Sequence, residues 1–107
     1  LQDDPARADK LRRFLVKAAR GDDLTDDFAV GSGYTPDAAL GLDVAAALPR
    51  GWRAAPMALV GKLERPDGSG RFSYRIGPEG DSRLLTVALS PSGRIAGYGI
   101  APDPDNR

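Results

Sequence analysis

The sequence contains no cysteine and no histidine. Without cysteine the chain has no disulfide, no thiol nucleophile and no thiolate ligand for a metal. Without histidine it lacks the commonest general base and the commonest metal ligand, so a Ser-His-Asp triad cannot be assembled from this chain alone. We therefore expect no metal site, and we assign no cofactor.

The chain also lacks an excess of either charge, since 15 Lys and Arg balance 15 Asp and Glu. Proteins that bind nucleic acid usually carry a concentrated basic surface. Polybasic clusters are likewise typical of proteins that contact anionic membranes. No stretch approaches the roughly 20 apolar residues that span a bilayer. We expect neither nucleic-acid binding nor a membrane span.

The length of 107 residues suits one hydrophobic core, and 41% of the residues are hydrophobic, as in an ordinary globular domain. We expect a single domain over residues 1–101. The alternating prolines and acids after it predict a tail or linker over 102–107. Because the chain begins at Leu1 rather than Met, we expect either a processed product or a piece of a longer polypeptide.

The first half of the chain has helical spacing. Asp4 can cap a helix that Pro5 begins, and apolar residues then recur every three or four positions. Gly21 is a typical helix stop. This pattern predicts a helix over residues 5–20.

Two further helical segments are expected before the sheet. Asp22 and Asp23 can cap a short turn over residues 24–29. Thr35 and Pro36 can open another helix, whose apolar positions continue to Leu48.

From Trp52 onward the apolar residues alternate with polar ones, which is the period of a half-buried strand. Clusters of Gly, Pro and Ser divide this part into four strands, expected at 52–64, 71–76, 85–89 and 94–100. Pro56 is expected to place the start of the first strand at an edge or a bulge. Short turns between successive strands specify an antiparallel meander. The fold class is α+β: N-terminal helices at about 5–48 packed on a curved four-stranded antiparallel sheet at about 52–101.

Helices followed by a curled antiparallel sheet resemble the NTF2-like, or ketosteroid-isomerase-like, cone fold. Residues 84–89 and 92–98 resemble the last hairpin of that superfamily. The chain is also similar to the small N-terminal domains of actinobacterial exported β-lactamase-like serine hydrolases. The cone fold implies a cavity between helices and sheet. Gly97 and Gly99, expected on the same face as Ile95, would then accommodate either sheet curvature or the close approach of a ligand.

Four residues are candidate ligand contacts: Trp52, Tyr74, Tyr98 and Arg75. The tyrosines could donate hydrogen bonds into a pocket, although buried tyrosines that satisfy a nearby carbonyl are commoner. Trp52 fits core or rim packing equally well. Arg75 could bind an anionic ligand or an acidic partner together with Arg71 and Ser73, or these side chains could form a solvated sheet surface.

Ketosteroid isomerases use a carboxylate base in an apolar pocket. The interiors of the four predicted strands hold no carboxylate, so none of those catalytic positions carries over to this chain. Asp26, Asp27 and Asp43 could face a cavity mouth, but helix capping explains acids at such positions better. We assign no catalytic residue.

The leading hypothesis is a non-catalytic accessory or small-ligand-binding domain of an exported bacterial protein. The alternative is a small pocket enzyme, of isomerase or cyclase type, that uses Asp or Tyr for acid–base chemistry on an apolar substrate. Candidate partners are a small apolar ligand, a neighbouring domain of the same polypeptide, and a second copy joined through the sheet face as a homodimer. The resemblance implies export or association with the cell envelope, while a cytoplasmic location stays open.

Overall fold

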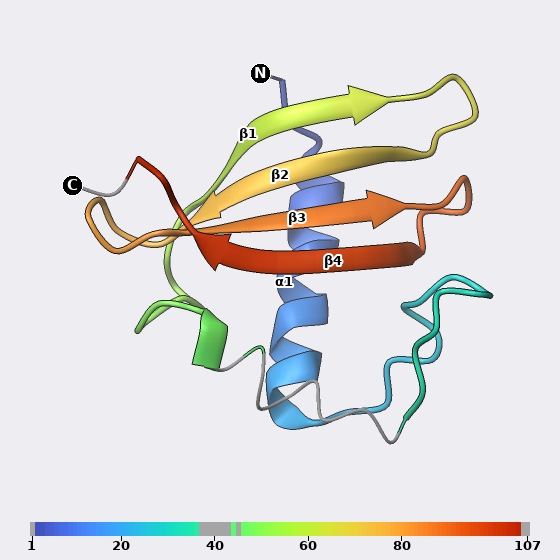
Figure 1. Cartoon of the computed structure of the whole chain (residues 1–107), viewed down its shortest axis with the longest axis horizontal. Coiled ribbons are helices and arrows are strands. Elements are labelled where there is room, and N and C mark those ends of the chain that lie inside the picture. Colours follow the sequence, from blue (N-terminus) through green and yellow to red (C-terminus); the bar gives the residue numbers. More distant parts are fainter. Residues whose placement is uncertain (1, 37–43, 45, 106–107) are drawn as a thin grey trace.

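The computed structural model describes residues 2–36, 44 and 46–105. The elements assigned within them are the helix α1 (Pro5–Arg20) and the strands β1 (Met57–Glu64), β2 (Gly70–Ile76), β3 (Arg83–Leu89) and β4 (Ile95–Pro102). The helix α1 crosses one face of the sheet (Figure 1). The molecule measures 38 × 33 × 21 Å, and its shortest dimension matches one helix packed on one sheet.

The helix α1 begins and ends where its sequence predicts. The Asp4 carboxylate accepts a hydrogen bond from the Ala6 amide at 3.0 Å, and Pro5 occupies the first turn. Gly21 ends the helix in the left-handed conformation, with φ of 78°, and its amide donates to the Ala18 carbonyl. No helix among the described residues is long and apolar enough to cross a membrane.

The four strands form one antiparallel sheet in the order β1-β2-β3-β4. This arrangement confirms the predicted meander and the α+β class. The curvature of a cone fold stays a prediction.

The predicted first strand, 52–64, is wrong at its beginning, because β1 starts only at Met57. The chain turns before it: the Trp52 amide donates to the Pro49 carbonyl at 3.1 Å, and the Ala55 amide donates to the Trp52 carbonyl at 3.2 Å. Pro56 follows this turn and has no amide to donate to a neighbouring strand. Residues 52–56 therefore form a turn that buries Trp52, and their alternation of apolar and polar residues does not reflect a strand.

The predicted short helix at 24–29 is a single turn. The Phe28 amide donates to the Leu24 carbonyl at 3.2 Å, and Phe28 then forms an isolated parallel bridge with Ile95 of β4. Most of the helix predicted between Pro36 and Leu48, including residues 37–43 and 45, lies outside the described residues. At its end the Leu48 amide donates to the Val44 carbonyl at 3.2 Å, as in a helical turn.

The hydrophobic core lies between α1 and the face of the sheet that we call the inner face. From the sheet it receives Phe72, Tyr74, Ile76, Leu85 and Val87, each at most 2% exposed. The stripe Leu11, Phe14, Leu15 and Ala18 of α1 covers them.

Aromatic rings close one side of this core. The Phe14 ring packs edge-on against Phe28 and Tyr98, with centroid distances of 5.7 and 5.6 Å. Phe28 in turn stacks on Tyr34 at 4.5 Å. Phe28, which follows α1, thereby contacts both the helix and β4, and Tyr34 packs on its ring.

Gly97 and Gly99 do not share a face with Ile95, contrary to the sequence-based expectation. The register shifts at the start of β4: Ile95 pairs with Leu89, whereas Gly97 pairs with Ala88. The extra residue between them forms a bulge, which reverses the alternation. Ile95 therefore points toward α1, and both glycines point away from it.

Candidate functional site

The four predicted contact residues do not form one site. Trp52 and Tyr74 are buried in the core, and half-buried Tyr98 packs against it. Arg75 follows Tyr74 in β2, so its side chain points to the opposite face of the sheet. These four side chains therefore do not line one common pocket.

The Tyr74 hydroxyl belongs to a closed polar cluster at the start of α1. It donates to the Asp3 carboxylate at 2.7 Å and accepts a hydrogen bond from the Arg7 guanidinium at 3.0 Å. Arg7 also lies over the Phe72 ring, 3.9 Å from its centroid. Burial raises the pKa of Tyr74 to about 12. A hydroxyl that stays protonated and already has both partners is suited to holding α1 on the sheet, not to proton transfer at neutral pH.

Trp52 has a structural partner that the sequence pattern did not indicate. The Arg12 guanidinium donates to the backbone carbonyls of Trp52, Arg53 and Ala55 at 3.0, 2.8 and 2.6 Å. These bonds fasten the turn before β1 to α1. The only sequence signal was a basic residue beside the apolar stripe of the helix, and such residues are usually solvated.

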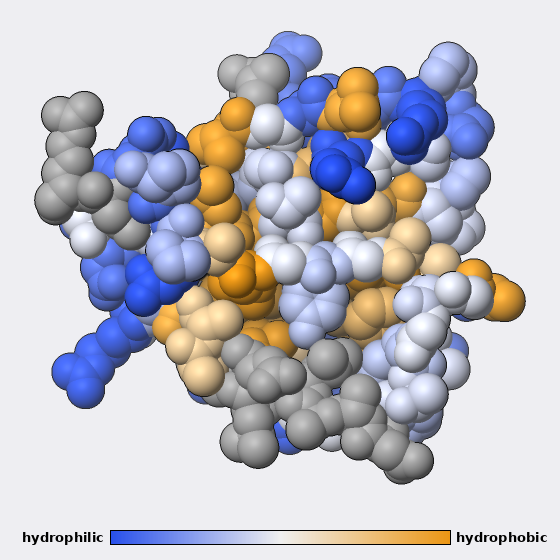
Figure 2. All heavy atoms as spheres, viewed as in Figure 1, coloured by the Kyte–Doolittle hydropathy of each residue, from blue (hydrophilic) through white to orange (hydrophobic). Residues whose placement is uncertain are grey.

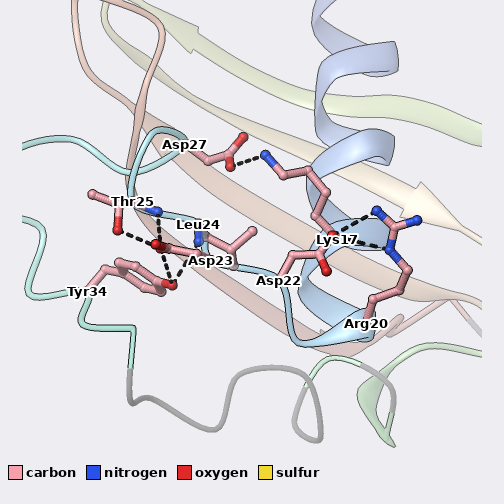
Figure 3. Close-up of polar contacts among 8 residues, drawn as sticks. All are labelled: Lys17, Arg20, Asp22, Asp23, Leu24, Thr25, Asp27 and Tyr34. Atoms are coloured by element: carbon pink, nitrogen blue, oxygen red, sulfur yellow. Dashed lines mark hydrogen bonds and ion pairs between the residues drawn. The ribbon is translucent and has the colours of Figure 1, made fainter.

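The acids after α1 stabilise the connecting loop (Figure 3). Asp23 accepts from the Thr25 amide and hydroxyl at 2.9 and 2.6 Å, and these two bonds hold the pKa of Asp23 below its usual value. Asp27 pairs with Lys17 of α1 at 2.5 Å, while the Tyr34 hydroxyl accepts from the Leu24 amide at 2.8 Å. Capping and ion pairing therefore account for Asp23 and Asp27. Asp43 lies outside the described residues.

The other face of the sheet, which we call the outer face, is not covered by any described element (Figure 1). Strand pairing arranges its side chains in three rows that cross the sheet. The central row consists of Gly61, Ser73, Thr86 and Gly99. The flanking rows are Leu63, Arg71, Ala88 and Gly97 on one side and Ala58, Arg75, Leu84 and Ala101 on the other.

The composition of the outer face is unusual for a surface in contact with water. Its rows contain no Asp, Glu or Lys, although these residues normally dominate exposed strands. Leu63 is 61% exposed. Figure 2 shows pale and orange residues over the middle of this face, with most of the strongly hydrophilic residues toward its border. The outer face thus carries mainly small and aliphatic side chains and few charges.

Arg75, one of two arginines in these rows, is already neutralised. Its guanidinium donates to Asp103 at 2.5 Å and to Asp105 at 2.8 Å. Asp103 also accepts from the Ser82 hydroxyl at 2.7 Å, and its side chain is only 1% exposed. Hydrogen bonds from Ser82 and from the Asp105 amide, together with Arg75, lower the pKa of Asp103 to about 2. The part of the predicted tail just after β4 is therefore held at the edge of the sheet.

Arg71, the other arginine, has no acidic partner among the described residues. It borders an open hollow of about 340 Å³ over β3 and β4, which we call the Arg71 hollow. The remaining lining residues are Thr86, Ala88, Gly97, Tyr98 and Gly99. A Cβ atom added at Gly97 or Gly99 would meet no atom within 4 Å, so the missing side chains create this space. The sequence pointed to Arg71 and to the glycines, but the bulge that brings them together was not visible in it.

No family model, curated protein or solved structure matches this chain. Among the described residues, no group of three or more acidic side chains could hold a metal ion. The outer face is therefore the candidate functional surface, and Arg71 is its one arginine without an acidic partner among the described residues.

Proposed function

We propose that this chain is a non-catalytic accessory domain that packs its outer face against a neighbouring domain of the same polypeptide. The observation that carries the proposal is the outer face itself, which combines small and aliphatic residues with arginine and lacks Lys, Asp and Glu. Interface centres are depleted of those charged residues and enriched in arginine.

The size of the face favours a tethered neighbour over a freely associating partner. Four strands about 4.8 Å apart and about seven residues long give a face of roughly 450 Å². A stable complex between free proteins buries about 800 Å² on each partner, whereas domains of one chain meet over about 300–750 Å² each. Tethering supplies the effective concentration that so small a contact needs.

The NTF2-like assignment, the bacterial origin and export of the protein are parts of the same proposal. They are supported by the order of helix and meander and by the likeness to N-terminal domains of exported hydrolases. A small-ligand-binding or enzymatic role is a weaker candidate. The Tyr74 hydroxyl already donates to Asp3, and Phe72 and Leu85 belong to the buried core between sheet and helix.

Thiol labelling tests the proposed docking, because the chain has no cysteine of its own. Ala88→Cys places one reporter on the outer face, and Ala6→Cys places a control on the exposed first turn of α1. Each variant is labelled with a maleimide in the isolated 107-residue chain and in the natural polypeptide that contains it. The protection factor is the labelling rate in the isolated chain divided by the labelling rate in the natural polypeptide.

We expect the Ala88→Cys reporter to be protected about tenfold or more in the natural polypeptide, and the Ala6→Cys control to be labelled at equal rates in both. Equal rates for the Ala88→Cys reporter would contradict docking through the outer face.

A further inference from the structure

Arg71 and Arg75 lie on the same face of the same strand but differ in their surroundings. Arg75 binds Asp103 and Asp105, whereas Arg71 has no acid beside it among the described residues. The two positions are four residues apart, which is about 13 Å along a strand. The outer face therefore has one neutralised end and one positively charged end.

A partner that covers the outer face must compensate Arg71. Removing a guanidinium from water without an acidic or hydrogen-bonding partner is strongly unfavourable. The three rows of the outer face contain no acid, so a second copy packed face to face would offer none from this surface. Charge complementarity thus favours a different surface, one that carries a carboxylate.

The Arg71 hollow provides the space for such a group. It lies over Ala88 and Gly97, which follow Arg71 across the sheet in the same row, and over Gly99 of the central row. Its walls are mainly apolar, and the Thr86 hydroxyl is already bonded to the Ser73 hydroxyl at 3.1 Å. The aliphatic part of a side chain that enters the hollow contacts carbon atoms, and its terminal group can reach the Arg71 guanidinium.

We infer that the Arg71 hollow binds an acidic side chain, Asp or Glu, from an otherwise apolar surface of the neighbouring domain. The carboxylate pairs with Arg71, and the stem of the side chain lies over Gly97 and Gly99. This inference rests on the proposed docking and adds its orientation: the acid of the partner sits at the Arg71 end of the face.

The test uses the Ala88→Cys reporter in three further backgrounds. Arg71→Gln removes the charge, and Arg71→Lys keeps the charge but not the two-pronged geometry. Arg65→Gln is the matched control, because Arg65 is an exposed arginine in the turn after β1 and has no ion pair among the described residues. Each protection factor compares the natural polypeptide with the isolated chain carrying the same substitutions, so a changed thiol reactivity cancels.

We expect Arg71→Gln to reduce the protection factor about tenfold or more, as for a charged hydrogen-bonded pair. Arg71→Lys should retain part of the protection, and Arg65→Gln should retain all of it. Equal protection in Arg71→Gln and Arg65→Gln would overturn the acidic partner while leaving docking intact. Absence of protection in the unsubstituted background would instead overturn docking itself. A dimer of the isolated chain in sedimentation equilibrium, with the reporter protected inside it, would overturn the inference in favour of a second copy.

Discussion

Alternate residues of β2 contribute to two surfaces that differ in burial, in side-chain size and in charge. Phe72 and Tyr74 point to the inner face, where α1 excludes water from them. Arg71 and Ser73 point to the outer face, which no described element covers. The inner face carries aromatic and large aliphatic side chains and is covered by α1, whereas the outer face carries mainly small side chains and one arginine with no acidic partner among the described residues. This difference is the basis of the proposal that the outer face packs against a neighbouring domain.

The largest expected effect comes from neighbouring substitutions on the two faces. Phe72→Ala should lower the free energy of unfolding of the isolated chain by about 3–5 kcal/mol, because it leaves a cavity in the core. Arg71→Ala should change it by less than about 0.5 kcal/mol, since that side chain is exposed. Urea denaturation of both variants measures the contrast. Similar losses in the two would contradict the division between faces.

Two strand glycines provide a second contrast. A Cβ at buried Gly70 would lie 2.5 Å from the Leu63 carbonyl oxygen, so Gly70→Ala should cost about 1–3 kcal/mol of unfolding free energy. Gly99→Ala meets open space and should be neutral or stabilising by up to about 1 kcal/mol. Thermal or urea unfolding distinguishes them. A destabilising Gly99→Ala would show that the chain itself needs this glycine.

Arg12 and Arg13 are adjacent in α1, but only Arg12 binds the turn before β1. Arg12→Met removes the donors to three backbone carbonyls and should lower the unfolding free energy by about 2 kcal/mol. Arg13→Met removes only an exposed pair with Asp9 and should cost less than about 0.5 kcal/mol. Denaturant titrations under one buffer condition measure both. Equal effects would mean that Arg12 does not fasten the turn before β1.

The last contrast concerns the neutralised end of the outer face. The pKa of Asp103 is lowered from 3.8 to about 2 in the folded chain, so its ionised form stabilises the fold above pH 4. That contribution should disappear as the pH falls from about 4 to about 2. The difference in unfolding free energy between the unsubstituted chain and Asp103→Asn should therefore shrink over that range. A pH-independent difference for Asp103→Asn would contradict the role given to its carboxylate.

The sequence predicts the features that depend on local signals. The bounds of α1 follow from Asp4, Pro5 and Gly21, and the meander follows from alternation and short turns. Both are set by neighbours along the chain, which is why they were predicted correctly.

The sequence does not predict the features that depend on distant partners. The bulge after Ile95 arises where β4 meets both β3 and the Phe28 segment, and it reverses the face assigned to Gly97 and Gly99. Arg12 binds the Trp52 carbonyl, which is 40 positions away along the chain. Asp103 binds Arg75, which is 28 positions away. No periodic pattern in the sequence marks such contacts. The Arg71 hollow depends on the bulge in β4, so it could be recognised only in the three-dimensional structure.

Gly99→Val, combined with the Ala88→Cys reporter, tests the central claim most directly. Valine suits a strand, and its Cβ meets nothing within 4 Å in the chain alone. We expect its unfolding free energy to stay within about 0.5 kcal/mol of the parent, and its protection factor in the natural polypeptide to fall at least about tenfold. Full protection in a stable Gly99→Val variant would contradict the occupation of the Arg71 hollow by the neighbouring domain.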